Sequence, residues 1–297
     1  MKIYIAALNL DVFLAYQGLF PARKLNVLRS FGMPSADNFG FMRDHRDKVG
    51  SLVLDSGTWT LNNPNATPEI QITLENYKNW VLEYGRHFNF IFNFDSDFTE
   101  RGFPTNLHNQ NKLEEASLNP VPVVHDIYGD EVDYYINEDY PLVAIGSFQI
   151  TNILDLNPVV HKLHQAGIKV HLFGTSQFDY LAYLPVYSCD STTWLQTGAF
   201  GKIYFWNPMK SSQDKTDIIS LEERLQTKQS PKNLYSSYAH RETFDAFLAE
   251  TFGITYENFL GTQGHFYKRL VNLHYFVQLE EIVNQEHQKR GFVIPDC

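Results

Sequence analysis

The sequence predicts an α/β fold, a TIM-type (β/α)8 barrel with a C-terminal helical appendage. Eight short apolar runs recur along the chain, and helical patterns separate most of them. Polar residues end many of these runs, as they do at the catalytic face of such barrels. The 297 residues, 43% of them hydrophobic, suffice for a barrel of this kind. We expect the catalytic barrel over residues 1–208 and a helical extension packed on it over residues 209–297.

The expected strands are rich in Val, Ile, Phe and Tyr and are bounded by Gly, Pro, Asn or Asp. Several are apolar throughout, which is typical of strands buried on both faces of a parallel sheet. An open doubly wound sheet is the alternative, but eight strands with dispersed polar ends favour closure. The expected strands are Lys2–Ala7, Ser51–Leu54, Asn89–Phe94, Val121–Val124, Pro141–Ile145, Ile168–Phe173, Pro185–Cys189 and Lys202–Trp206.

Helical patterns follow five of the strands. Thr73 is placed to cap the first of these helices, and Gly167 to end the fourth. The five are expected over Thr73–Tyr84, Leu107–Ser117, Asp130–Asn137, Asp155–Ala166 and Ser176–Tyr183. Beyond Trp206, polar stretches give way to helical patterns, which we assign to the appendage. These cover Thr243–Phe252, Tyr256–Leu260 and a segment from Gly264 to about Lys289.

Composition restricts the partners. The net charge of −10 argues against attraction of nucleic acid over the whole surface, so binding would need a local basic patch. The basic residues near Arg23, Lys24 and Arg29 are interpreted as an ordinary solvated face. Two cysteines imply no disulfide framework. No apolar run is long enough for a membrane span, and the first ten residues lack a signal-peptide pattern. We therefore expect a cytoplasmic protein without a membrane partner.

Aspartates stand at three expected strand ends: Asp55, Asp95 and Asp190. In a barrel of this class the active site lies at the carboxyl-terminal ends of the strands. Two carboxylates in different environments can divide the roles of nucleophile and general acid/base, as glycosidic chemistry requires. The alternative for any single aspartate is a cap on the following helix.

Five short motifs occur in a consistent order between about residues 50 and 207. They are Leu54-Asp55-Ser56-Gly57-Thr58-Trp59, Phe92-Asn93-Phe94-Asp95, Val143-Ala144-Ile145-Gly146, His171-Leu172-Phe173-Gly174 and Tyr187-Ser188-Cys189-Asp190-Ser191. This ordered set resembles the tRNA-guanine transglycosylase superfamily. It is most similar to the zinc-free phage and bacterial relatives that act on 7-deazaguanine bases in DNA.

The resemblance implies a pentosyltransferase that exchanges or removes a guanine or 7-deazaguanine base, of the queuine type, in a nucleic acid. Asp190 would attack C1′ and form a covalent glycosyl-enzyme, Asp55 would move protons, and Asp95 would bind the guanine edge. Gly146 would let the base approach the backbone. The remaining implied substrate-binding residues are Ser56, Gly57, Trp59, His125, Ser147, Phe148 and Gly174, with Trp59 and Phe148 expected to stack on the base.

The chain departs from the tRNA enzymes of this superfamily in four respects. Val124-His125-Asp126 stands in place of their glutamine-glycine motif, and Ser147 stands in place of their second glycine after Ala144-Ile145-Gly146. The chain also lacks their Cys-x-Cys-x-x-Cys zinc motif, and it shows no C-terminal RNA-binding domain. DNA is therefore the favoured polymer over tRNA, no metal or other cofactor is expected, and the resemblance implies a homodimer.

Two other functions stay open at this point. A metal-dependent barrel hydrolase could use His125, Asp55 and Asp95, or a non-catalytic barrel could bind a nucleotide. His171 alternates with the apolar Val170 and Leu172, so it is interpreted as a core histidine.

Overall fold

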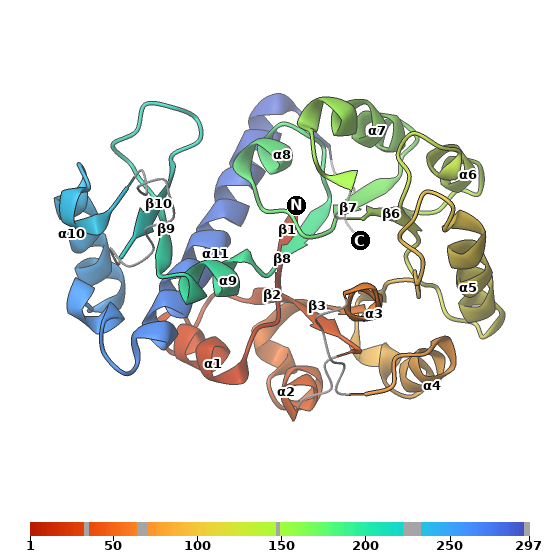
Figure 1. The fold of residues 1–297 in the computed structure, drawn as a ribbon, viewed down its shortest axis with the longest axis horizontal. Helices are drawn as coiled ribbons and strands as arrows, with labels where there is room; N and C mark the ends of the chain where they lie inside the picture. The colour runs from red at the N-terminus through yellow and green to blue at the C-terminus, as the bar shows by residue number, and fades with distance from the viewer. Residues whose placement is uncertain (33–35, 64–69, 147–148, 222–232, 294–297) are drawn as a thin grey trace. The chain divides into compact units, whose positions relative to one another are not determined.

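The computed structural model describes residues 1–32, 36–63, 70–146, 149–221 and 233–293 and confirms the predicted parallel barrel (Figure 1). Consecutive strands lie side by side, and the last strand, β8, pairs with the first, β1. The strands are β1 (Lys2–Ala6), β2 (Leu25–Ser30), β3 (Val49–Asp55), β4 (Phe90–Ile91), β5 (Val123–Val124), β6 (Leu142–Ile145), β7 (Lys169–Leu172) and β8 (Ser188–Ser191).

The ring closes between β4 and β5. Phe92 and Val121 form a parallel bridge just outside the two strands. The amide of Val121 donates to the carbonyl of Ile91 at 2.8 Å, and the amide of Asn93 donates to the carbonyl of Val121 at 2.9 Å. With this link every strand has two neighbours, so the sheet is a closed barrel and not the open sheet considered as the alternative.

Helices follow the strands, and Figure 1 shows α4 to α7 on the outer side of the ring. The barrel helices are α2 (Ala36–Phe39), α3 (Thr58–Asn62), α4 (Leu74–Tyr84), α5 (Phe103–Glu115), α6 (Glu131–Asn137), α7 (Ile153–Gln165) and α8 (Phe178–Ala182). A π-helix, η1 (Gly40–Asp44), and two 3-10 helices, η2 (Arg46–Lys48) and η3 (Gly85–His87), also lie between the strands. Thr73 caps α4 as predicted, because its side chain accepts from the amide of Asn76. Gly167 follows α7 with a φ of 81°, the left-handed conformation expected there.

The second strand was missed in the sequence. β2 reads Leu-Asn-Val-Leu-Arg-Ser, and its arginine was assigned to a solvated basic face. That assignment is wrong for Arg29, which is buried. Its Nε donates to Asn38 Oδ1 at 2.5 Å, and Nη1 donates to the carbonyl of Leu8 at 2.8 Å. These partners and the adjacent Phe41 ring make burial of the charge tolerable, so a charged residue can occupy a barrel strand.

The predicted eighth strand is present but does not belong to the barrel. β9 (Lys202–Trp206) pairs antiparallel with β10 (Thr216–Ser220) in a separate two-stranded sheet. Its burial alternates along the chain, which is typical of a strand with one solvated face. The total of eight barrel strands was therefore right, with β2 in place of Lys202–Trp206.

The chain forms two compact units. The first comprises residues 1–10, 24–191 and 283–297, and the second comprises residues 11–23 and 192–282. This division differs from the predicted boundary at residue 208, and the predicted helical extension contains the hairpin strand β10. Elements of the second unit include α1 (Leu10–Leu19), α9 (Thr193–Ala199), α10 (Arg241–Phe252) and most of α11 (Gly264–Arg290), with the short turns η5 (Tyr235–Ser237) and η6 (Tyr256–Phe259).

No helix within the described ranges combines the length and the apolar character that crossing a bilayer requires.

The interior of the barrel is filled with side chains. Tyr4, Val53, Phe92 and Ala144 are buried at its centre, together with residues from the remaining strands. This is the packed interior expected of a closed barrel of eight strands, so the barrel is a core and not a channel. Groups that act on a ligand must therefore lie at the strand ends, above this core.

Candidate functional site

The pleat of the strands carries the predicted residues to one end of the barrel. Side chains alternate between the two faces of a strand, so a residue two positions after an interior one also faces inward. Val53, Val123 and Ala144 belong to the interior core. Asp55 follows Val53 by two residues, His125 follows Val123 in the same way, and Gly146 follows Ala144. Each lies at or just past the end of its strand. They are therefore directed to the axis of the barrel at its carboxyl-terminal face.

Asp55 ends β3 and begins a tight turn. Its Oδ2 accepts a hydrogen bond from the amide of Gly57 at 3.0 Å, and Gly57 has a φ of 82°. A Cβ on Gly57 would lie 2.6 Å from the backbone nitrogen of Gly32. The Asp-Ser-Gly motif therefore has a physical reason: only glycine combines this left-handed conformation with such a close backbone approach.

Replacing Gly57 with alanine should destabilise the protein by about 3 kcal/mol or more, because a strained φ is combined with a backbone clash. Gly167 is the matched control, since it has a φ of 81° and nothing within 4 Å of an added Cβ. Gly167→Ala should cost only about 1 kcal/mol, the conformational part alone. Urea unfolding of both variants measures the difference. Equal losses in the two variants would show that the contact with Gly32 is unimportant.

Asp95 lies in the loop after β4 and is surrounded by protein donors. Its Oδ1 accepts from Thr58 Oγ1 at 2.8 Å and, at a longer 3.4 Å, from Ser56 Oγ. Its Oδ2 lies 2.9 Å from His125 Nε2. All of these groups are buried. Asp95 is thus the centre of a network that joins the β3 turn to the end of β5, and both of its oxygens have partners within the protein.

His125 is fixed on several sides. Besides its bond to Asp95, its ring stacks on Phe98 with centroids 4.7 Å apart and planes at 17°. Its backbone amide donates to Glu131 Oε2 at 2.7 Å. A Cβ on Gly146 would lie 2.9 Å from His125 Nδ1, so the glycine makes room for the imidazole. This gives Gly146 a role within the protein besides the predicted one of admitting a base.

Asp190 lies on β8, level with Tyr4 of β1 in the register of the sheet, and is buried. The amide of Gly174 donates to its Oδ1 at 3.1 Å, and His171 Nε2 lies 3.3 Å from the same oxygen. The left-handed φ of 66° at Gly174 turns the chain after β7. Two predicted motifs, those ending at Gly174 and at Ser191, therefore meet at one carboxylate.

The charges of Asp95 and Asp190 act on Asp55. Burial raises the pKa of Asp55 from 3.8 to about 7, and the negative charges of Asp95 and Asp190 contribute to the increase. Hydrogen bonds from the Gly57 amide and the Ser30 hydroxyl oppose it. A carboxyl with a pKa near 7 is half protonated at neutral pH, which is the condition for a general acid/base. Asp55 is therefore the proton-transfer candidate among the three, and its interaction with Asp190 indicates that the two side chains share a site.

The other predicted residues vary in their placement. Ser56 and Gly57 lie in the β3 turn, but Trp59 on α3 is 53% exposed and has no described stacking partner. Ser147 and Phe148 lie outside the described residues. Among the described residues, no three His, Cys, Asp or Glu side chains form a group that could hold a metal ion.

Neither a protein-family model nor a curated protein matches this chain. The resemblance to the guanine transglycosylases therefore rests on the ordered motifs alone. The strand ends nevertheless bring together the aspartates of three of these motifs, at the face where barrel enzymes act.

Several residues of the site were not predicted. Thr58 and Ser30 were not selected, although both are hydroxyl residues beside strand-end aspartates. Glu131 was not recognised because it lies in the first turn of α6, where an acidic residue is ordinary. Burial raises its pKa, and its Oε1 has no partner among the described residues. His171 was interpreted as a core residue; it is buried, and it also contacts Asp190.

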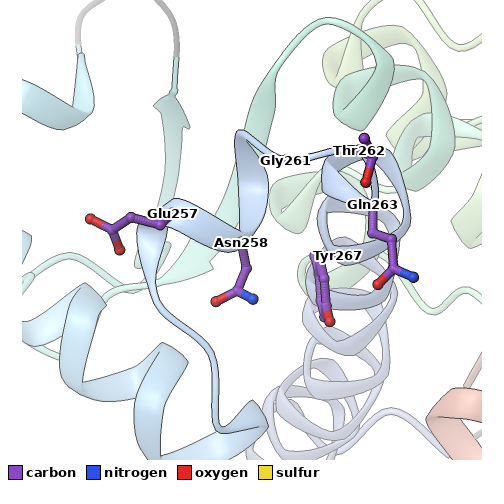
Figure 2. A pocket seen from close by; sticks show the side chains of 6 residues that line it. All are labelled: Glu257, Asn258, Gly261, Thr262, Gln263 and Tyr267. Carbon is purple, nitrogen blue, oxygen red and sulfur yellow. The ribbon is translucent and has the colours of Figure 1, made fainter.

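The second unit contains an open pocket without any predicted site residue (Figure 2). Its side chains come from η6, from the following turn and from the start of α11. It is lined by Glu257, Asn258, Gly261, Thr262, Gln263 and Tyr267. No buried ionisable group lies among these lining residues, so the pocket offers less for catalysis than the ends of the barrel strands.

Proposed function

We propose that this protein is a base-exchanging or base-removing glycosylase of the guanine transglycosylase type, acting on a guanine or 7-deazaguanine nucleotide in a nucleic acid. DNA is the favoured polymer. The observation that carries the proposal is the difference in surroundings between two strand-end carboxylates, Asp55 and Asp190. Asp55 has a pKa near 7, whereas Asp190 has two hydrogen-bond donors on a single oxygen. Such a division suits one acid/base and one nucleophile.

The chemistry balances with these two groups. An oxygen of Asp190 forms a bond to C1′ of the nucleotide while the bond from C1′ to the base breaks. The bonding electrons leave with the base nitrogen, which takes the proton of Asp55. In the second step, ionised Asp55 removes a proton from the incoming base, whose nitrogen attacks C1′ and releases Asp190. Water in place of the incoming base would give base removal.

Asp95 has a different role in this mechanism from the base-binding role that the motifs implied. Its oxygens already accept from Thr58, Ser56 and His125. Its contribution to base recognition would therefore pass through His125, which it orients, or would require one of these bonds to open. The charge of Asp95 also helps to keep Asp55 partly protonated at neutral pH.

The decisive experiment supplies radiolabelled guanine together with DNA or tRNA and measures incorporation into each polymer by nucleoside analysis. The proposal predicts label in the DNA nucleosides, dependent on Asp190. Free guanine released from unlabelled DNA would identify base removal instead of exchange. If neither incorporation nor release occurs with either polymer, the proposed function is wrong.

A further inference from the structure

His171 lies in the interior of the barrel, directly below the candidate nucleophile. It is completely buried on β7. The rings of Phe92 and Phe173 lie 4.8 Å from its ring, centroid to centroid, and Tyr4 lies at 6.1 Å. An imidazole in such apolar surroundings must have hydrogen-bond partners for its two nitrogens, since an unsatisfied buried polar group is costly.

Both ring nitrogens have a partner. Nδ1 lies 2.8 Å from Ser188 Oγ, and Nε2 lies 3.3 Å from Asp190 Oδ1. A carboxylate oxygen can only accept, so Nε2 must carry the proton of this hydrogen bond. In the neutral imidazole, Nδ1 is then the acceptor for the Ser188 hydroxyl. The residues form a chain in which Ser188 donates to His171 and His171 donates to Asp190.

The order of the three residues is that of a serine–histidine–aspartate triad, but its geometry excludes that use. Ser188 is completely buried, so its hydroxyl is not accessible to a substrate. The accessible end of the chain is the aspartate, which lies at the strand ends with 7% of its surface exposed. Ser188 therefore orients His171, His171 orients the carboxylate of Asp190, and the carboxylate is the group that can contact a substrate.

The donors on Asp190 are distributed unequally between its oxygens. His171 and the amide of Gly174 both donate to Oδ1. No described residue donates to Oδ2. Two donors hold negative charge on Oδ1 and fix the plane of the carboxylate, and this leaves Oδ2 as the oxygen with free lone pairs.

We propose that His171, oriented by Ser188, is the positioning residue that holds Asp190 through Oδ1 and directs Oδ2 to the reacting carbon. The hydrogen-bonded part of this inference stands on the contacts alone, and the part concerning attack rests on the proposed function. Titratable side chains of the described residues that interact with Asp190 include His171 from β7 and Asp55 from β3, and Tyr4 of β1 is its partner in the register of the sheet. His171 donates a hydrogen bond to the carboxylate, whereas a negative charge on Asp55 repels that of Asp190.

Two substitutions separate positioning from packing. His171→Gln places an amide nitrogen near the original Nε2 and can still donate to Asp190. His171→Leu fills a similar apolar space and cannot donate. We expect His171→Leu to slow formation of the covalent nucleotide adduct by about 10- to 100-fold at unchanged KM, the effect of losing one charge-assisted hydrogen bond. His171→Gln should retain the rate to within about threefold.

Nitrogen-15 NMR of histidine-labelled protein tests the hydrogen bonds without any substrate. The wild type should show His171 with a protonated Nε2 and an unprotonated Nδ1, and Asp190→Asn should shift the Nε2 signal. Ser188→Ala should shift the Nδ1 signal. The His171→Gln variant assigns the signals, and His108→Gln, on the exposed face of α5, is the control that should leave them unchanged.

The outcomes separate this inference from the proposed function. An unprotonated Nε2, or equal adduct rates in His171→Leu and His171→Gln, would overturn the positioning role. A protonated Nε2 that responds to Asp190, in a protein that forms no adduct with DNA or tRNA, would support the hydrogen-bond chain and count against the glycosylase proposal alone.

Discussion

Asp190→Asn should abolish base exchange, with a loss of at least about a thousandfold in the rate of covalent adduct formation, because an amide oxygen is a poor nucleophile and cannot form the glycosyl ester. The fold should persist, since asparagine keeps an oxygen that accepts from the Gly174 amide and from His171. Intact-protein mass spectrometry after acid quenching detects the adduct directly, and it should be present in the wild type and missing in the variant.

Asp47→Asn is the control for this experiment. Asp47 lies in η2 of the same unit and is exposed, so the substitution removes the same charge at a distance from the strand-end aspartates. It should leave both the adduct and the exchange rate unchanged. Wild-type exchange by the Asp190→Asn variant would show that another group is the nucleophile.

Asp55→Asn should raise stability at alkaline pH while lowering activity. The folded-state pKa of Asp55, about 7, lies above its ordinary value of 3.8, so the folded protein binds this proton more tightly than the unfolded chain. The favourable contribution is complete below pH 3.8 and is lost as pH rises through 7. At pH 8 the half-buried carboxylate is ionised in the field of the Asp95 and Asp190 charges, and an uncharged amide removes a cost of about 2 to 4 kcal/mol.

Urea unfolding at two pH values measures this difference. The variant should exceed the wild type in stability at pH 8 and should match it near pH 3, below both pKa values, where the wild-type carboxyl is protonated in the folded and the unfolded state. Asp47→Asn should give no such pH-dependent gap. A gap of the opposite sign, or none, would mean that Asp55 is ionised at neutral pH and is not the proton donor.

The same substitution should lower the rate of base release by about a hundredfold, the usual effect of losing a general acid. In the wild type, adduct formation should decline as pH rises through about 7, because the step uses protonated Asp55. The groups that set this pH dependence are Asp95 and Asp190, whose charges raise the pKa, and Ser30 and Gly57, whose hydrogen bonds lower it. Single-turnover rates between pH 5 and 9 would show the decline.

The barrel could be predicted because most of its strands are short apolar runs with a polar residue at the end. β2 was not predicted because Asn26 and Arg29 interrupt its apolar pattern, and the groups that accept hydrogen bonds from Arg29 lie outside the strand, on Asn38 and Leu8. β9 was misassigned for the opposite reason. Its residues resemble a barrel strand, and only its antiparallel pairing with β10 distinguishes it.

The location of the site was predictable from the rule that places barrel active sites at the strand ends, but the pairing of its groups was not. Which side chains meet depends on the register between strands, which no local pattern encodes. His171 and Ser188 are paired residues of β7 and β8, and that register brings His171 Nε2 to Asp190. The network of Asp95 likewise needs the β3 turn and the end of β5 to converge.

The assignment of residues 283–293 to the barrel unit has a consequence for the order of events during synthesis. Asn284 on α11 donates to the carbonyl of Met1 at 3.0 Å, across a separation of 283 residues, and His287 contacts the carbonyl of Leu181. Both edges of β1 are paired only once β8 has also formed. β1 therefore completes its contacts only after much later segments of the chain have been synthesised. Because contacts so distant in sequence are slow to form, one edge of β1 stays unpaired and in need of protection until β8 has been synthesised, and its contact with α11 forms later still.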